Sequence, residues 1–596
     1  MKKKETTNKK ETGNISRRQF IQGAGIVGGA AIVSGLAACS PATSTITSTL
    51  TGTTTVTAPP VTTTITATPW LPAKWDYSAD LVIIGTGDAG YSAAITAIDA
   101  GSSVLVLEKL SQQFEGGSSR VAANYICAYY NGTTGQPDVA SGTAYLRALA
   151  AGTVEDDSIF AAQAQGYNDN LTVIQAMGGQ FGTLPGTASV PAAPGASAYH
   201  QFVIATPGAP ASTVVAGFTV GASGDYKLWQ FYKDQAVKRN VNVMYETPAT
   251  ELIQNANTKE ILGIYATNNG AKIAIKANKA VILACGSIEF APDLQKQYWP
   301  ASPVYSTGTP GDTGDGIRMA QKVGADLWHM NYGFGTYGAF IPPGGKPMIN
   351  GVYPVSARGI SVNKMGNRFN NNNSINGPLG GFANELGVNL AYDITTVDWN
   401  SVPCWCIFDD TARLKGPIMS TSLVASTGPG VAGKSGWFSL VDNNWSKDNM
   451  DEVNKGWILK GNSLADLAAQ IANDSDNNGK MSPTGLQATV DAWNVDCTNK
   501  TDAQFFTNPT GLVPLSGPPY YAMKLWPNYV NPSAGPRRSK LCEVLNPDKQ
   551  PIPRLYSAGE LGAFWGWLQS SGSHLAEALW TGRVAGTNAA ALTSWV

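Results

Sequence analysis

The sequence has few of the residues that hold metals and haem. Its 596 residues include three histidines and seven cysteines. The cysteines form neither a C-x-x-C pair nor a C-x-x-C-H haem attachment site. We therefore predict no metal site in the chain. Any haem or iron–sulfur centre that exchanges electrons with it is expected to belong to a separate partner.

Charged residues are also scarce, at 14%, and the formal net charge is −1. This balance provides no basic surface, so we predict no nucleic-acid partner. Hydrophobic residues make up 43% of the chain, which is typical of a folded globular protein. A chain of this length is expected to form two or more domains.

The N-terminus has the pattern of an export signal. Lysines precede Ser16-Arg17-Arg18-Gln19-Phe20-Ile21, and an uncharged stretch then reaches Ala38. The pattern resembles a twin-arginine signal. The alternative is a membrane-spanning helix, which the abundance of Gly and Ala disfavours. Because the twin-arginine route carries folded proteins, we expect the mature protein in the periplasm or on the outer face of the cytoplasmic membrane.

A lipid anchor and a linker are predicted after this signal. Leu36-Ala37-Ala38-Cys39 resembles a lipoprotein signal-peptidase box, in which Cys39 receives the lipid. Ordinary cleavage near Ala38 is the alternative. Residues 43–68 contain 14 threonines, a composition that buries little surface and stays extended. We therefore assign residues 1–39 to the signal and 40–75 to a linker.

A nucleotide-binding unit is predicted next. The apolar run 80–84 reads as a buried parallel strand, and the turn Gly85-Thr86-Gly87-Asp88-Ala89-Gly90 leads into an Ala-rich helix. Gly85 permits the tight turn, Gly87 lets the backbone approach a pyrophosphate, and Gly90 lets the helix pack on the strand. The helix N-terminus then faces the phosphates.

A second apolar strand, 103–107, ends in Glu108, whose position suits binding of the adenosine ribose hydroxyls. The combination of strand, glycine turn, helix and acidic residue indicates a dinucleotide-binding site far more specifically than the glycine triplet alone. They leave FAD and NAD as the alternatives.

Five further segments follow in order: Gly116-Gly117-Ser118-Ser119, 245–253 around Ala249, 279–286 around Ala284, Thr313-Gly314-Asp315-Gly316, and 552–560 ending in Glu560. In this order they resemble the fumarate reductase/succinate dehydrogenase flavoprotein family, the FAD-dependent oxidoreductase 2 group. This family includes ketosteroid dehydrogenases and urocanate reductase. The resemblance implies FAD, held noncovalently, because the family's covalent-flavin histidine is not found between Gly116 and Asn124.

The resemblance also implies the fold and the cofactor contacts. We expect an α/β protein with a Rossmann-like FAD-binding domain and an inserted α+β capping domain that holds the substrate. The boundaries are 76–331 and 517–596 for the FAD-binding domain and 332–516 for the cap. The expected cofactor contacts are Gly85, Gly87, Ala89, Gly90, Glu108, Lys109, Gly117, Ser118, Ser119, Ala249, Ala284, Asp315, Glu560, His574 and Leu575.

The chain departs from the family where fumarate-reducing members clamp two carboxylates with His and Arg. Asn531 falls at a clamp His, Gln569 at a clamp Arg, and Asn376 at the proton-donor Arg. Three neutral amides at these positions cannot form the charge-assisted hydrogen bonds that hold the carboxylates of fumarate, so we expect that fumarate is not the substrate. Aromatic residues near the flavin instead suit a flat or apolar substrate, although they equally fit a protein core: Phe564, Trp565 and Trp567.

Three polar residues are candidates for the chemistry. Tyr521 is a candidate proton donor or acceptor, Arg537 a candidate for orienting an anionic or carbonyl oxygen, and His574 a candidate hydrogen-bond donor at the start of the last helix. Each also has a structural alternative: packing for Tyr521, a surface arginine pair for Arg537, and helix capping for His574.

The resemblance implies a hydride moving between flavin N5 and an activated C=C or CH–CH bond of an enoate-, enone- or steroid-like substrate. The direction is left open. The electron donor or acceptor would be an envelope cytochrome or a quinone-linked protein. The alternative is a flavin-bearing electron-transfer or binding lipoprotein without substrate turnover of its own.

Overall fold

A computed structural model describes most of the chain after residue 69. The described residues are 70–122, 125–150, 152–184, 188, 190–205, 211–215, 218–221, 228–306, 308–345, 347–349, 359–370, 390–419, 445–505, 507, 509–566 and 568–595. The predicted signal and nearly all of the predicted linker therefore lie outside the described residues, as do Asn376 and Trp567. None of the described helices combines the length and apolarity needed to cross a membrane.

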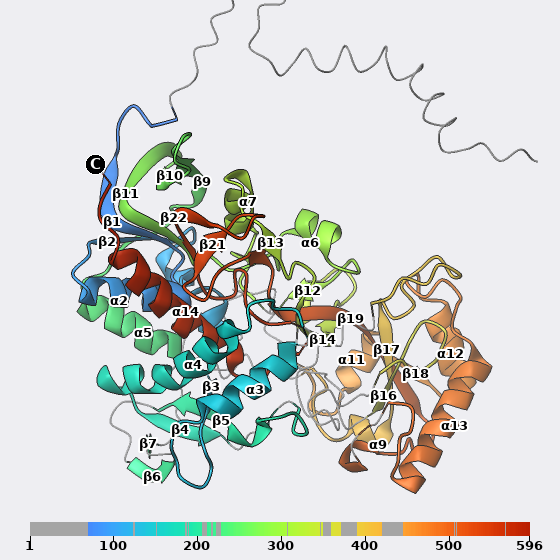
Figure 1. Cartoon of the computed structure of the whole chain (residues 1–596). Helices are drawn as coiled ribbons and strands as arrows, with labels where there is room; N and C mark the ends of the chain where they lie inside the picture. Colours follow the sequence, from blue (N-terminus) through green and yellow to red (C-terminus); the bar gives the residue numbers. More distant parts are fainter. Residues whose placement is uncertain are drawn as a thin grey trace, which may run out of the picture. The chain divides into compact units, whose positions relative to one another are not determined.

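A mainly parallel sheet forms the centre of the nucleotide-binding part (Figure 1). Its path runs β21-β22-β11-β1-β2-β8, with β9 and β10 attached to β11. The strands β1 and β2 are short and apolar, and side chains on both faces are buried, as expected for a parallel sheet covered on both sides. The bounds are β1 Tyr77–Ile84, β2 Val104–Leu107, β8 Asn242–Met244, β9 Ala249–Gln254, β10 Ile261–Asn268, β11 Ala271–Leu283, β21 Glu543–Leu545 and β22 Pro551–Ser557.

Two helices pack against each other beside this sheet. They are α2 Asp88–Asp99 and α14 Ser573–Ala590. The close approach depends on Gly582, because a Cβ there would lie 2.3 Å from the carbonyl oxygen of Ala89. Helix α14 therefore holds the start of α2 from one side, and α5 Leu228–Lys238 contacts α2 as well.

A second sheet, which the sequence did not predict, lies within the first FAD-binding segment. It has the order β3-β5-β4-β7-β6 and is accompanied by two helices. The aromatic side chains of Tyr129, Tyr145 and Tyr167 pack together here and form part of a separate core. The bounds are β3 Tyr125–Tyr129, α3 Val139–Ala150, α4 Ser158–Ala176, β4 Phe181–Leu184, β5 Tyr199–Ile204, β6 Ala211–Val215 and β7 Phe218–Gly221.

The cap is built around a third sheet, of order β15-β14-β19-β17-β16, with β12 and β18 also paired to β19. Strand β19, Tyr520–Pro532, pairs with β17 and β18 through its first half and with β14 through its second half. It is thus a continuous connection between the cap and the nucleotide-binding part. The bounds are β12 Tyr305–Ser306, β14 Gly333–Phe340, β15 Met348–Ile349, β16 Gly359–Val362, β17 Cys404–Asp409, α9 Asp410–Arg413, α11 Met450–Asn454, β18 Ile458–Gly461, α12 Leu464–Ala472 and α13 Pro483–Asn499.

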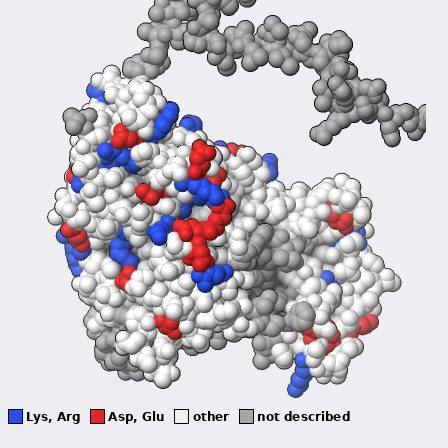
Figure 2. Space-filling model, viewed as in Figure 1, with Lys and Arg blue, Asp and Glu red and all other residues white. Residues whose placement is uncertain are grey.

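Short elements complete the described chain: η2 Gln112–Phe114, η3 Gly117–Val121, η4 Ala196–Ala198, α6 Pro292–Tyr298, α7 Asp315–Lys322, β13 Leu327–Trp328, η5 Pro509–Gly511 and β20 Gly535–Pro536. On the face in Figure 2, acidic and basic side chains are interspersed over a largely uncharged surface. The predicted domain boundaries are not tested by this arrangement and stay predictions.

Candidate active site

A cavity lies at the carboxyl ends of β1, β2 and β11. Open parallel sheets bind ligands at this edge, where the loops and helix N-termini gather. Every predicted cofactor contact except Gly90 lines it: Gly85, Gly87, Ala89, Glu108, Lys109, Gly117, Ser118, Ser119, Ala249, Ala284, Asp315, Glu560, His574 and Leu575. Their roles toward the cofactor stay predictions.

Two positions of the glycine turn after β1, Gly85 and Gly90, have no space for a side chain. Gly85 has φ +109°, and a Cβ there would lie 2.3 Å from the carbonyl oxygen of Ala284. A Cβ on Gly90 would lie 2.0 Å from the carbonyl oxygen of Gly85. Gly90 therefore allows α2 to pack on the turn, and its backbone does not line the cavity. The N-terminus of α2 is left directed at the cavity, where anions are favoured.

The carboxylate of Glu108 is buried at the end of β2. It accepts a hydrogen bond from the Thr86 hydroxyl and one of 2.9 Å from the backbone N–H of Leu110. Burial raises the pKa of Glu108, and the hydrogen bond from Thr86 opposes this rise. The side chain is thus fixed between the glycine turn and β2, where it can accept hydrogen bonds from the hydroxyls of a ribose.

A buried network that sequence reasoning missed supports the loop before Gly117. Glu115 is fully buried and accepts hydrogen bonds of 2.7 Å from the hydroxyls of Tyr91 and Tyr245, and a bond from the Lys233 ammonium. Trp229 packs against Gly116 and donates a 2.9 Å hydrogen bond to the Thr86 carbonyl. The glycine pair was visible in the sequence, but its supports come from distant segments.

Two predicted contacts, Lys109 and Asp315, bind each other. The Lys109 ammonium lies 2.8 Å from a carboxylate oxygen of Asp315 and donates a 2.7 Å hydrogen bond to the Thr313 hydroxyl. Lys109 is the single basic side chain among the described residues that line the cavity, which also include four acidic ones: Glu108, Asp312, Asp315 and Glu560. The wall therefore carries an excess of carboxyl groups.

Three of the carboxyl groups near the cavity form a buried cluster. One oxygen each of Glu289, Asp312 and Glu560 lies within 4.8 Å of the other two. Neither Glu289 oxygen accepts a hydrogen bond from a group outside the cluster, whereas Asp312 accepts a 2.7 Å bond from the Ser118 hydroxyl. Burial raises the pKa of Asp312 to about 7 and raises the pKa of Glu289 and of Glu560 well above the ordinary range.

The carboxyl cluster therefore keeps protons at neutral pH instead of carrying three charges. Glu289 lies behind the wall that Asp312 and Glu560 form. The sequence predicted Glu560 but neither of its neighbours. Glu289 and Asp312 are 23 positions apart, and both are more than 200 positions from Glu560. Carboxyl oxygens at this spacing also suit a cation, so the prediction of no metal site stays untested.

His574 lines the cavity in the first turn of α14. Its Nε2 is hydrogen-bonded to Oε1 of Gln569, whose amide nitrogen is buried without a partner. Burial lowers the pKa of His574 to about 3, so the imidazole is neutral at physiological pH. It can serve as a hydrogen-bonding group, whereas the positive end near the cavity comes from the helix N-terminus.

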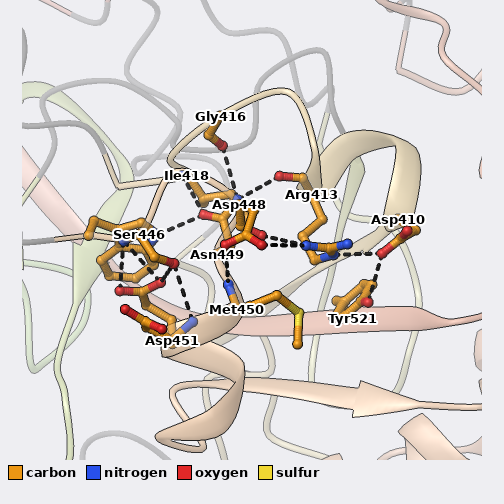
Figure 3. Close-up of polar contacts among 12 residues, drawn as sticks. Asp410, Arg413, Gly416, Ile418, Ser446, Asp448, Asn449, Met450, Asp451 and Tyr521 are labelled. Carbon is orange, nitrogen blue, oxygen red and sulfur yellow. Dashed lines mark hydrogen bonds and ion pairs between the residues drawn. The ribbon is translucent and has the colours of Figure 1, made fainter.

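Tyr521 does not line the cavity and belongs to a polar cluster in the cap (Figure 3). Its hydroxyl donates a 2.9 Å hydrogen bond to Asp410, which also accepts one of 2.6 Å from Nε of Arg413. The ring stacks on Phe408 with 5.5 Å between centroids. Burial and then Asp410 raise the pKa of Tyr521. These contacts give Tyr521 a structural role, and its catalytic role stays a prediction.

Arg537 also lies away from the cavity wall. Its guanidinium lies 2.7 Å from a carboxylate oxygen of Asp326 and 3.5 Å from one of Glu155. The neighbouring Arg538 is fully buried, forms an ion pair with Glu577 and donates a 3.0 Å hydrogen bond to the Gly559 carbonyl. Arg538 thus ties the turn that carries Glu560 to α14, a role that the paired arginines in the sequence did not reveal.

The aromatic candidates Phe564 and Trp565 are buried. Phe564 packs edge-on against Trp328 at 5.8 Å and beside Trp580 at 5.6 Å. Trp565 lies 6.2 Å from the His574 ring. Phe564 and Trp565 are therefore both core residues, and neither lines the cavity.

The cavity fits FAD in its chemistry. Its lining includes Gly85, which has no space for a Cβ, the N-terminus of α2, and the buried carboxyl groups of Glu108 and Glu560. These features define a flavoprotein with a Rossmann-like FAD-binding domain.

The family described as FAD binding domain matches residues 80–575, and the chain belongs to this family. Urocanate reductase of Eggerthella lenta is 27% identical over 537 residues, covering 88% of this chain and 77% of the relative. Fumarate reductase (cytochrome) of Shewanella frigidimarina is 26% identical over 524 residues, covering 86% and 77%.

A solved structure shows the same fold. The crystal structure of 3-ketosteroid delta1-dehydrogenase from Sterolibacterium denitrificans in complex with 1,4-androstadiene-3,17-dione superposes with a TM-score of 0.68 at 21% identity, covering 86% of this chain and 99% of that one. The predicted family, fold class and FAD cofactor are confirmed. The chain is an FAD-dependent oxidoreductase acting on CH–CH groups.

Proposed function

We propose that the enzyme moves a hydride to or from an activated C=C or CH–CH bond of an enoate-, enone- or steroid-like substrate, and that fumarate is not its substrate. FAD, when bound, supplies N5 as the hydride donor or acceptor. Support comes from the charge of the cavity wall, where the single described cation, Lys109, is already paired with Asp315. A dicarboxylate needs cations to replace its hydration.

The amides at the clamp positions support the same conclusion. Asn531 lines the cavity, and Gln569 is bound to His574 on its edge. An amide forms a weaker hydrogen bond to a carboxylate than a guanidinium or imidazolium does. Neutral groups at these positions instead suit a carbonyl oxygen, with His574 as a neutral hydrogen-bonding neighbour.

An anaerobic reoxidation assay tests the substrate class. We expect photoreduced enzyme to be reoxidised by at least one enone, enoate or steroid dienone, and fumarate to react at least about 100-fold more slowly, since two lost charge-assisted bonds amount to about 3 kcal/mol. The double variant Asn531→His/Gln569→Arg should gain activity on fumarate. Fumarate as the fastest oxidant of the wild type would contradict the proposal, and a flavin that responds only to redox proteins would favour the electron-carrier alternative.

We also propose that the protein is exported by the twin-arginine route, anchored by a lipid on Cys39, and served by a separate envelope cytochrome or quinone-linked partner. The support is the Arg17-Arg18 motif, the box before Cys39 and the lack of a haem attachment motif. One relative of the chain is a fumarate reductase (cytochrome).

Cell fractionation tests the proposed location. Because the twin-arginine pair is read by its receptor and not by charge alone, Arg17→Lys/Arg18→Lys should retain the protein in the cytoplasm, while the control Lys9→Arg/Lys10→Arg is exported. Cys39→Ala should abolish labelling with a radioactive fatty acid and release the mature protein from the membrane. Normal export of the Arg17→Lys/Arg18→Lys variant would refute the route.

A further inference from the structure

A loop in the cap has the spacing of a calcium-binding loop. It joins α12 and α13, so it lies between two helices, as in a helix–loop–helix calcium site (Figure 1). Asp474, Asp476 and Asn478 occupy the first, third and fifth positions, and Gly479 occupies the sixth. Gly479 has φ +73°, which provides the sharp turn needed there. The pattern departs from a calcium loop at its twelfth position, where Gly485 replaces the bidentate glutamate.

The backbone of this loop is folded tightly by its own hydrogen bonds. The N–H of Asp476 donates to the Asp474 carboxylate at 2.9 Å, and the N–H of Met481 donates to Asn477 at 2.8 Å. Ser482 caps the following helix by accepting a bond of 3.0 Å from the N–H of Gly485. The carboxylates of Asp474 and Asp476 thus converge on one point.

A lysine from another element occupies that point. The ammonium group of Lys524, on β19, lies 3.0 and 2.8 Å from the two Asp474 oxygens and 2.8 Å from an Asp476 oxygen. An ammonium group has three N–H donors, and that of Lys524 donates hydrogen bonds to both carboxylates. Its side chain is 24% exposed, so the ion pairs are partly shielded from water.

We propose that Lys524 supplies the cation of this calcium-type loop, so that the loop folds without a divalent metal and fastens the α12–α13 hairpin to β19. Two features support the assignment. The loop lacks the glutamate that would provide two further oxygens, and Ca²⁺ requires six to eight. The ammonium also places a positive charge where the ion would have to enter.

The contact between Lys524 and the loop can affect the cavity because both Lys524 and Asn531 lie on β19. The same strand pairs with β17 and β18 around Lys524 and then reaches Asn531 on the cavity wall. Burial lowers the pKa of Lys524, but the hydrogen bonds and charges of Asp474 and Asp476 outweigh it and raise the pKa overall. The lysine therefore stays charged and acts as a positioning residue between the cap hairpin and the strand that enters the site.

Thermal unfolding of the FAD-loaded protein tests the proposal. The midpoint of the wild type should be the same in EDTA and in calcium at about 1 mM, well above the range of calcium sensors. Lys524→Met should lower the midpoint by about 2–4 °C, while Lys460→Met, which removes an exposed lysine from neighbouring β18, should leave it unchanged. Calcium should restore part of the loss in Lys524→Met, and more of it in Lys524→Met/Gly485→Glu.

A second pair of variants separates this role from general loss of packing. Asp476→Asn should lower the midpoint of the wild type, because it removes a partner of Lys524. In the Lys524→Met background it should raise the midpoint, because it removes repulsion between two uncompensated carboxylates. An increase in the wild-type midpoint on addition of calcium would overturn the proposal. So would a Lys524→Met midpoint as high as that of Lys460→Met. A change in midpoint of the same sign for Asp476→Asn in both backgrounds would also overturn it. If Lys524→Met does not fold, the calcium titration of the wild type and Asp476→Asn still decide.

Discussion

Replacing Gly90 with alanine is expected to yield a protein that no longer retains FAD. The new Cβ would lie 2.0 Å from the carbonyl oxygen of Gly85 and 2.9 Å from its carbonyl carbon, both backbone atoms that cannot rotate away. The clash can be relieved only if α2 moves away from the turn, and this movement withdraws the helix N-terminus from the phosphates. Overpacking of this kind costs about 1–3 kcal/mol, and the upper end corresponds to about a 100-fold weaker Kd.

The ratio of flavin to protein absorbance after purification measures this effect, and quenching of FAD fluorescence by the apoprotein gives the Kd. Gly132→Ala is the matched control, because a Cβ at Gly132 would meet no atom within 4 Å. The control should be as yellow as the wild type. A Gly90→Ala protein with wild-type flavin content and affinity would show that the turn does not cradle the cofactor.

Replacing Asp88 with asparagine is expected to stabilise the protein most at pH 8 and less than half as much at pH 5. Asp88 is fully buried at the first position of α2, and neither carboxylate oxygen has a hydrogen-bond partner. Burial raises the pKa of Asp88 to about 7. Asparagine has the same shape but cannot ionise, so it mimics the protonated acid.

The direction follows from the protons bound in each state. The unfolded chain loses the Asp88 proton near pH 4, whereas the folded protein retains it until about pH 7. Folding is therefore opposed increasingly as the pH rises from 4 to 7, and the penalty is constant above that. A difference of about three pKa units corresponds to about 4 kcal/mol at pH 8, part of which the positive end of α2 offsets.

Denaturant unfolding at pH 5, 6, 7 and 8 checks the Asp88 prediction. Asp99→Asn, at the other end of α2, is the control: its exposed carboxylate is paired with Arg239, with atoms 2.7 Å apart. Loss of this surface pair should cost up to about 1 kcal/mol and bring no gain as the pH rises. An equal effect of Asp88→Asn at pH 5 and at pH 8 would mean that Asp88 does not ionise in this range.

Much of the cofactor site could be predicted because its signals are local. The strand 80–84, the turn through Gly90 and Glu108 at the end of the next strand all lie within 30 residues. Backbone geometry restricts which residues a tight turn before a helix accepts, so the glycines reveal the turn without knowledge of the fold. The family resemblance added Glu560 and His574, and both line the cavity.

The polar candidates depended on neighbours that the sequence does not reveal. Arg537 is paired with Asp326 and Glu155, and Tyr521 with Asp410. Sequence position alone cannot show whether an arginine or tyrosine faces a substrate or another side chain, because its partner comes from a distant segment. The calcium-type spacing at Asp474 was readable, but the lysine that occupies it is 50 positions away.

The sequence by itself determined the family, the cofactor and the turn that cradles it, because these depend on short-range backbone constraints and on an ordered series of motifs. The tertiary structure alone decided which charges meet: the cluster of Glu289, Asp312 and Glu560, the burial of Asp88, and the insertion of Lys524 between two aspartates. Electrostatic interactions depend on distance in space and on exclusion of water, and both are fixed only when segments far apart in the chain pack together.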